Sequence, residues 1–273
     1  MSGAYISIVM ALKLATTHLG TAFESHCSHL LRESLGMSLT RVGGKGDGGV
    51  DLRGWWHLPQ DSIGSYGRVH SYLKPGLFTD GCIDVSAPEP GRRLRLLAQC
   101  KAEKIKAGPR LIREMEGVAR RGFDLLHQHG QAKGLEDDPQ IESMPDEWLA
   151  VPTGSADILD TITTVICTRA GFSSSATVEA MRSRVPMLLL HVPFDTEDAV
   201  RLIEWQQKDP RDGLNDISSP YPLPSVLQAA YSNPALAGSA GILGENLELR
   251  KEFVNRRHDG DNSEAFSMGL WWR

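Results

Sequence analysis

Two short segments of the chain carry an acid, an amide and a lysine in an arrangement that suits phosphodiester hydrolysis. Residues 43–49 form a turn with five glycines that leads directly to Asp51, and a later apolar segment ends in Gln99 and Lys101. Glycine permits φ > 0 and close backbone approach, which indicates a loop shaped around a ligand or a partner strand. Cleaving a phosphodiester takes a metal that polarises the phosphate, a source of hydroxide near pH 7 and charge relief for the leaving oxygen.

These residues can be assigned roles in that chemistry. Magnesium prefers hard oxygen ligands, so Asp51 is the expected first ligand and Gln99 offers a neutral amide oxygen. Side chains alternate along a strand, so Lys101 lies on the same side as Gln99 and can orient or deprotonate a water or hold the phosphate. Cys100 faces the other way and is interpreted as a core thiol. Taken alone, an Asp followed by Gln-x-Lys arises by chance in most chains.

Two further acids have alternative interpretations. Asp47 lies inside the glycine turn, and shaping that turn through its own side chain is its simplest role. Glu24 lies beside the apolar stripe of a predicted helix over residues 21–35. One interpretation places its carboxylate at the margin of the core, near the candidate site. The other makes it a surface glutamate that the helix dipole favours in a first turn.

The elements that must position these side chains can be predicted from hydrophobic periodicity. Phe23, Cys27, Leu30 and Leu31 form one apolar stripe, with Gly36 as the helix C-cap. Strands are expected over residues 37–42, 50–56, 94–101, 163–168 and 185–192, and further helices over 109–129, 173–184, 196–207 and 245–256. This alternation predicts an α/β fold with a mixed sheet.

Composition sets limits on the class of protein. The 273 residues, 41% hydrophobic and 23% charged, are typical of one large globular domain or one domain with an appendage. The longest apolar runs fall far short of the ~20 residues that a membrane span needs. The four cysteines contain no CxxC pair, which argues against a zinc ribbon or a disulfide framework. We expect reduced, mostly buried thiols.

The net charge of −5 is unevenly distributed. Residues 92–121 contain ten Lys or Arg against three Glu, a net of +7, so the remainder carries −12. This asymmetry is typical of a protein with one basic, phosphate-binding surface on an otherwise acidic molecule. Alternatively, the basic residues are simply the solvated face of a helix. The first 23 residues contain no acid and one base, Lys13, which half-fits a transit peptide.

The same residues resemble a known group of proteins, the Mrr-like branch of the PD-(D/E)xK restriction-endonuclease-like superfamily. That branch carries G-x-x-F-E in a helix, then G-D-G-G-hydrophobic-D, then Q-x-K. Residues 20–24, 46–51 and 99–101 match these elements as GTAFE, GDGGVD and QCK. The long insertion and the extended C-terminal part look more like a fungal mitochondrial family, called required for respiratory growth protein seven. The resemblance spans roughly residues 20–192.

The resemblance implies a restriction-endonuclease-like αβββαβ core, with a mixed central sheet flanked by helices. The implied domain covers residues 20–195 with an insertion at 57–91, between an N-terminal segment (1–19) and a C-terminal extension (196–273) packed on the core. It also implies a Mg²⁺- or Mn²⁺-dependent DNA endonuclease in mitochondria, with a place in mitochondrial DNA maintenance. A homodimer is one expectation, because cutting two strands takes two sites.

By the same resemblance Asp51 is the central metal ligand, Gln99 the second ligand, Lys101 the catalytic lysine and Glu24 the helix carboxylate that completes the site. The expected nucleic-acid contacts are Lys45, Arg53, Lys104 and Lys106. The superfamily's commonest form has Asp or Glu where this chain has Gln99, and the lost charge weakens Mg²⁺ binding. The alternative is therefore a catalytically inactive nuclease-fold protein that binds nucleic acid.

Other enzyme motifs are missing from the sequence. The glycine run is not followed by the G-K-[ST] of a Walker loop. Residues 171–175 (GFSSS) lack the second glycine of a nucleophile elbow, and the nine histidines include no HExxH. These absences leave the nuclease interpretation without a close rival.

Overall fold

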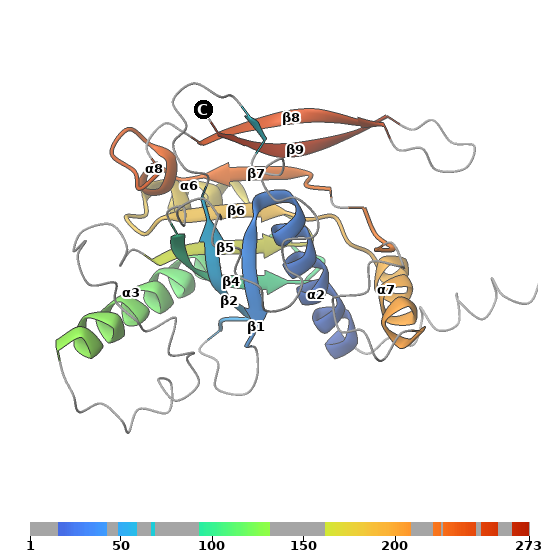
Figure 1. Cartoon of the computed structure of the whole chain (residues 1–273), viewed down its shortest axis with the longest axis horizontal. Coiled ribbons are helices and arrows are strands. Elements are labelled where there is room, and N and C mark those ends of the chain that lie inside the picture. Colours follow the sequence, from blue (N-terminus) through green and yellow to red (C-terminus); the bar gives the residue numbers. More distant parts are fainter. Residues whose placement is uncertain are drawn as a thin grey trace, which may run out of the picture.

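The computed structural model has a six-stranded mixed sheet with helices on both faces (Figure 1). The strand order is β1-β2-β4-β5-β6-β7, and a second sheet has the order β3-β9-β8. The structure describes residues 16–42, 49–58, 67–68, 93–131, 162–208, 221–224, 226–243, 247–255 and 264–272. The predicted α/β class with a mixed sheet flanked by helices is confirmed.

The N-terminal half of the sheet is antiparallel. Helix α2 (Thr16–Leu35) ends at Gly36, whose φ of 66° is one that L side chains rarely adopt. The chain then forms β1 (Met37–Arg41) and β2 (Leu52–His57), and β2 pairs with β4 (Arg93–Lys101). Segments separated by the glycine turn and by the insertion are thereby brought side by side.

The C-terminal half of the sheet adds parallel strands. Helix α3 (Pro109–Gln131) connects β4 to the parallel strand β5 (Ile162–Thr168), and α6 (Ser174–Arg182) connects β5 to β6 (Met187–His191). All seven residues of β5 are buried, as expected for a strand covered on both faces.

The last segments complete the main sheet and form the second one. Helix α7 (Thr196–Lys208) is followed by β7 (Ala229–Ser232), which pairs antiparallel with β6, and by the short helix α8 (Pro234–Ala237). Strands β8 (Leu247–Asn255) and β9 (Glu264–Trp272) form a hairpin.

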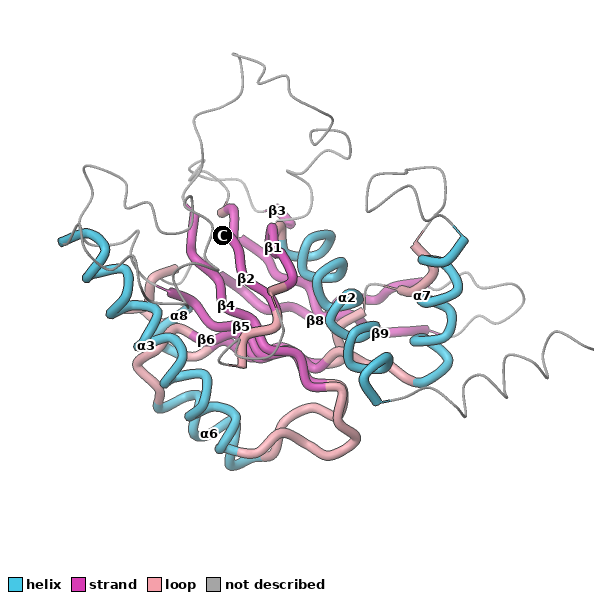
Figure 2. Tube along the Cα trace, turned by 90° about the horizontal axis from the view of Figure 1, so that it is seen from below, coloured by secondary structure: helices cyan, strands magenta, loops and turns pink. Residues whose placement is uncertain are grey.

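Two hydrophobic clusters cover the two faces of the main sheet. One joins α2 and α7 to the sheet and includes Phe23, Leu31 and Leu202, all at most 1% exposed. The other joins α3 and α6 to the opposite face and includes Ile112 and Ala176. Figure 2 shows these two pairs of helices on either side of the strands. Strand β4 contributes alternate residues to each cluster.

Two predictions for the C-terminal region need correction. The charged segment at residues 245–256 was expected to be helical, and it forms β8 instead. Its nine residues pair in continuous register with β9, and long-range pairing of this kind overrides a weak local preference. Strand β7 was not predicted, because it lies in a stretch rich in Pro, Gly and Asn.

The insertion and the N-terminal segment lie mostly outside the described residues. Within the insertion, Gly67–Arg68 forms β3 and pairs with Trp271 and Trp272 of β9. Residues 196–243 supply core side chains such as Ala199 and Leu236 to the cluster beneath α2.

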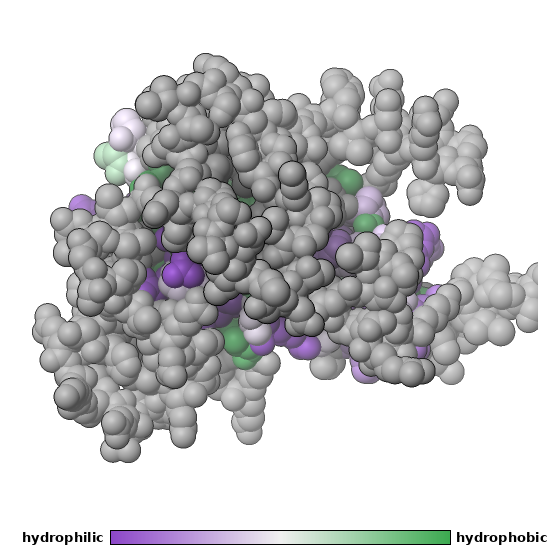
Figure 3. Space-filling view, viewed as in Figure 1, coloured by the Kyte–Doolittle hydropathy of each residue, from purple (hydrophilic) through white to green (hydrophobic). Residues whose placement is uncertain are grey.

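Among the described helices, none has the length and apolar character to cross a bilayer. On the face seen in Figure 3 the coloured residues are mostly hydrophilic, with smaller hydrophobic areas between them.

Candidate functional site

Asp51 lies directly against the strand that carries Gln99 and Lys101. Its backbone N–H donates to the Ala98 carbonyl at 3.0 Å, and the backbone N–H of Cys100 donates to Asp51 Oδ2 at 2.6 Å. The Asp51 carbonyl accepts from Val42 N–H at 2.9 Å, which holds the start of β2 between β1 and β4. The predicted juxtaposition of the acid and the Gln-x-Lys segment is therefore observed.

Gln99 has an unsatisfied polar atom at this site. Its side chain is 5% exposed, and its Oε1 has no hydrogen-bond partner. A buried carbonyl oxygen without a partner costs free energy and calls for a ligand or a solvent molecule. Gly49 lies next to Gln99 at a φ of 86°, a backbone conformation that L side chains rarely adopt, and a Cβ there would be in ordinary contact with Gln99 Nε2 at 3.4 Å.

Strand alternation separates Gln99 and Lys101 from Cys100. Leu97 belongs to the cluster beneath α3 and α6, whereas Cys100 belongs to the cluster beneath α2. Gln99 and Lys101 therefore share the face of Leu97. Cys100 is a buried core thiol, as predicted, and Lys101 is half-buried at the end of β4.

Several polar residues lie at the same end of the sheet as Lys101. The strand register aligns Lys101 with Thr168 of β5 and Thr168 with His191 of β6. The carboxyl ends of parallel strands are a common place for ligand sites. Burial lowers the pKa of His191. The hydrogen bond to the Arg169 carbonyl opposes this shift, and the charge of Lys106 adds to it. Sequence reasoning missed His191, because no spacing pattern links it to Lys101.

Glu24 lies on α2 and forms an ion pair with Arg41, the last residue of β1. The distance from Arg41 Nε to Glu24 Oε2 is 2.6 Å, and Arg41 also donates to Thr21 Oγ1 at 3.2 Å. The Glu24 side chain is 15% exposed. Arg41 is the register partner of Leu52, the neighbour of Asp51, so Glu24 and Asp51 approach the same end of the sheet. The catalytic role assigned to Glu24 stays a prediction.

The expected nucleic-acid contacts differ in accessibility. Lys104 and Lys106 are exposed in the loop that follows β4. Arg53 is half-buried, and its burial lowers the pKa of the guanidinium. Lys45 lies outside the described residues, as does Asp47.

The basic stretch at residues 92–121 does not form a single surface. Arg95 is fully buried, and the guanidinium carbons of Arg93 and Arg95 lie 4.7 and 5.1 Å from the centroid of the Trp55 ring. Arg110 is 89% exposed and pairs with Glu114 at 2.8 Å. The accessible charge thus lies in the loop after β4 and along α3 as far as Arg121.

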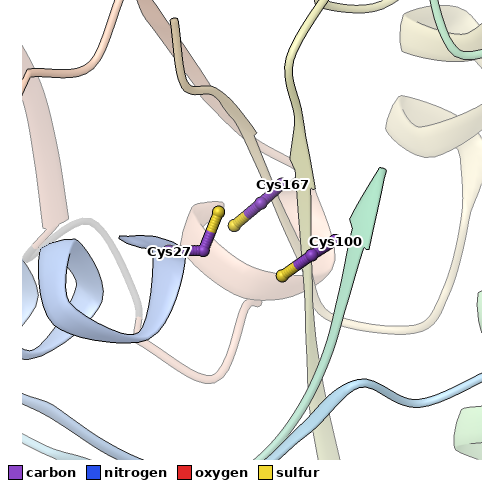
Figure 4. Close-up of side chains that lie close together, drawn as sticks. All are labelled: Cys27, Cys100 and Cys167. Atoms are coloured by element: carbon purple, nitrogen blue, oxygen red, sulfur yellow. The ribbon is translucent and has the colours of Figure 1, made fainter. Parts of the chain in front are cut away.

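Three cysteines meet on the opposite face of the sheet. Cys27 of α2, Cys100 of β4 and Cys167 of β5 are free, and their Sγ atoms all lie within 4.8 Å of one another (Figure 4). Hydrogen bonds from Cys100 and Cys27 lower the pKa of the Cys167 thiol, and burial raises the pKa of Cys27. The expectation of buried thiols is confirmed for these three, and Cys82 lies outside the described residues.

Comparison with known proteins finds a match to a family model. Residues 15–123 match the model of the family described as required for respiratory growth protein 7. The chain is 32% identical over 145 residues to "Required for respiratory growth protein 7, mitochondrial" from two Saccharomyces cerevisiae strains, YJM789 and S288c. The aligned part covers 47% of this chain and 56% of each relative, so the chain spans about half the length of the relatives it matches.

No solved structure matches the chain significantly. The family match covers α2, β1, β2, β4 and the first part of α3, and it includes Glu24, Asp51, Gln99 and Lys101. The family model and the yeast relatives therefore both support the family named required for respiratory growth protein 7, which the long insertion and the C-terminal part were expected to indicate. The resemblance of the motifs to the Mrr-like branch stays a prediction.

Proposed function

We propose that this protein is a metal-dependent DNA endonuclease of the Mrr-like type, with Asp51, Gln99 and Lys101 at its centre. The observation that carries the proposal is the unpartnered, buried Oε1 of Gln99 on the same strand segment whose Cys100 N–H binds the Asp51 carboxylate. One carboxylate and one amide oxygen are hard ligands, the kind that Mg²⁺ and Mn²⁺ take together with water and phosphate oxygens. The residues present therefore fit such an ion.

A divalent ion bound by Asp51 and Gln99 would polarise the scissile phosphate and lower the pKa of a bound water. The chain's own residues orient the carboxylate ligand and stabilise charge on the substrate. The Cys100 N–H holds one oxygen of Asp51 at 2.6 Å, which fixes the orientation of the carboxylate. Lys101, half-buried on the same face as Gln99, stabilises negative charge on the phosphate or orients the attacking water.

Exposed lysines after β4 extend the proposal to nucleic acid. Lys104 and Lys106 follow Lys101 by three and five residues and are both exposed. Phosphate contacts by Lys and Arg supply most of the sequence-independent affinity for DNA. The yeast relatives are named as mitochondrial, and we propose the same location for this chain.

A cleavage assay tests the proposal. Supercoiled, branched and single-stranded DNA would be incubated with Mg²⁺, Mn²⁺ or EDTA. The informative variant is Asp51→Asn, because it keeps an oxygen for the Cys100 N–H while it removes the charge and replaces the second oxygen by an NH₂ group. Asp195→Asn is the matched control, since exposed Asp195 caps α7 through a bond to Asp198 N–H at 2.9 Å, and an asparagine preserves that bond.

We expect metal-dependent cutting by the wild type and by Asp195→Asn, and a loss of at least about 100-fold in Asp51→Asn. Circular dichroism and thermal melts of both variants establish that they are folded. Folded wild-type protein that binds DNA without cutting it under any metal would contradict the endonuclease. That outcome would favour the nuclease-fold binding protein instead.

A further inference from the structure

The three-cysteine cluster on the α2 face of the sheet is separate from the proposed nuclease centre. Cys27 and Cys167 are fully buried, and Cys100 is 9% exposed. Within the described part of the chain, it is the one group of three or more His, Cys, Asp or Glu side chains whose ligand atoms lie this close together. Figure 4 shows the three sulfurs directed toward a common point between α2, β4 and β5.

The fold brings these thiols together from distant parts of the chain. Cys100 and Cys167 are register partners on adjacent parallel strands, so their side chains lie side by side on one face. Cys27 lies on the apolar stripe of α2 with Phe23 and Leu31, and α2 packs over that same face. Each sulfur therefore comes from a different element, and the backbone of each is held by helix or sheet hydrogen bonds.

We propose that Cys27, Cys100 and Cys167 form a binding site for a thiophilic d¹⁰ metal ion, Cu⁺ or Zn²⁺. Thiolate sulfur selects these soft ions, whereas Mg²⁺ and Mn²⁺ prefer oxygen. Metal–sulfur bonds of about 2.3 Å place three sulfurs of a trigonal site about 4 Å apart. The observed upper limit of 4.8 Å between ligand atoms therefore requires side-chain movement of less than about 1 Å.

Charge balance and coordination number favour different ions. Each thiol that becomes a ligand loses its proton, so three thiolates leave a net −2 around Cu⁺ and −1 around Zn²⁺. The smaller residual charge favours Zn²⁺ in a buried environment, since an unpaired buried charge is costly. Among the described residues the cluster has three sulfur ligands and no fourth, which favours Cu⁺, because structural Zn²⁺ sites are almost always four-coordinate. The experiment must therefore offer both ions.

The test is metal binding by the reduced, full-length chain, with no nucleic acid present. Purified protein would be titrated anaerobically with Cu⁺ against a chromophoric Cu⁺ chelator, and separately with Zn²⁺ against a zinc chelator. We expect one ion per chain, a rise in melting temperature on binding, and X-ray absorption that reports three sulfur neighbours at about 2.3 Å. If the protein binds one of the two ions and not the other, that result supports the site and identifies its metal.

Alanine variants connect binding to the cluster. Cys27→Ala, Cys100→Ala and Cys167→Ala should each weaken binding at least about 100-fold, because loss of one of three ligands removes a metal–sulfur bond. Cys82→Ala is the matched control and should bind as the wild type does. The X-ray absorption measurement on wild type keeps the test decisive if a core variant fails to fold.

Three outcomes would overturn the site: folded, reduced wild type that binds neither ion, oxygen or nitrogen neighbours in place of sulfur, or unchanged binding in the triple alanine variant. None of these depends on nuclease activity. The metal site and the endonuclease can therefore fail independently.

Discussion

Gln99 is neutral at a position where a carboxylate would attract a cation more strongly. Two unit charges 4 Å apart interact by about 4 kcal/mol at an effective dielectric of 20, and burying a carboxylate offsets part of that gain. The net effect of adding one charge beside Asp51 is thus expected to be favourable but modest.

Gln99→Glu should therefore tighten Mg²⁺ or Mn²⁺ binding about tenfold, or about 1.4 kcal/mol, as measured by calorimetry. Gln99→Leu is the companion variant, because it removes the amide oxygen while keeping most of the buried volume, and it should weaken binding. Equal affinities in the wild type and both variants would mean that Gln99 is not a ligand.

Asn233 holds together the elements at the far side of the sheet. It is 1% exposed, and its Oδ1 accepts from Met187 N–H at 2.9 Å and Leu236 N–H at 3.1 Å. Its Nδ2 donates to the carbonyls of Ala180, Ser183 and Val185. One side chain thus joins the end of α6, the start of β6 and the first turn of α8.

Asn233→Ala should destabilise the fold by about 3 kcal/mol, because it leaves several buried backbone groups without partners. For a chain of this size that corresponds to a fall in melting temperature of about 6–10 °C. Gln228→Ala, at an exposed position in the same segment, is the control and should change stability by less than about 0.5 kcal/mol. A melt of Asn233→Ala that matches the control would show that water replaces these bonds at no cost.

The whole molecule combines an acidic net charge with exposed lysines beside the candidate site. Lys104 and Lys106 are exposed, and Lys106 is close enough to His191 to affect its pKa. Counterion release makes DNA affinity fall linearly with salt on logarithmic axes, with a slope set by the number of phosphate contacts.

Lys104→Ala and Lys106→Ala should each reduce that slope by about 1 and weaken DNA binding uniformly across sequences. Fluorescence anisotropy at several salt concentrations measures both quantities. Arg201→Ala removes an equal charge from α7, on the other face of the sheet, and should leave the slope unchanged. A slope that falls equally in all three variants would mean that charge acts through the whole molecule and not through this loop.

Stability should depend on pH through a histidine buried between α2 and the C-terminal region. Burial lowers the pKa of His26 from 6.5 to about 4, with a smaller effect from His29. Its Nδ1 lies 3.1 Å from Tyr221 Oη, and its ring stacks on Phe194 at a centroid distance of 5.4 Å. In the unfolded chain His26 binds a proton below about pH 6.5, whereas in the folded chain it binds that proton only below about pH 4.

The free energy of unfolding should therefore decrease as pH falls from 6.5 to 4, with His26 accounting for up to about 3 kcal/mol of the loss. Urea denaturation at a series of pH values should give a flatter profile for His26→Gln than for the wild type. His18→Gln, at an exposed position on α2, should follow the wild type. Parallel profiles for all three proteins would remove His26 from the pH dependence.

Local patterns in the sequence determined most of the N-terminal half of the fold. The stripe of Phe23, Cys27 and Leu31 identified α2, and the apolar run before Gln99 identified a strand buried on both faces. Period-two alternation predicted that Cys100 faces away from Gln99, as observed. Such features depend on neighbours a few residues apart, so a single sequence contains the information.

Only the tertiary structure decided which distant residues meet. The ion pair of Glu24 with Arg41, the five hydrogen bonds of Asn233 and the convergence of Cys27, Cys100 and Cys167 each join separate elements. The segment at residues 245–256 has charges that suit a helix, yet its pairing with β9 made it a strand. These outcomes depend on packing and strand register across long sequence separations, which local propensity and spacing do not encode.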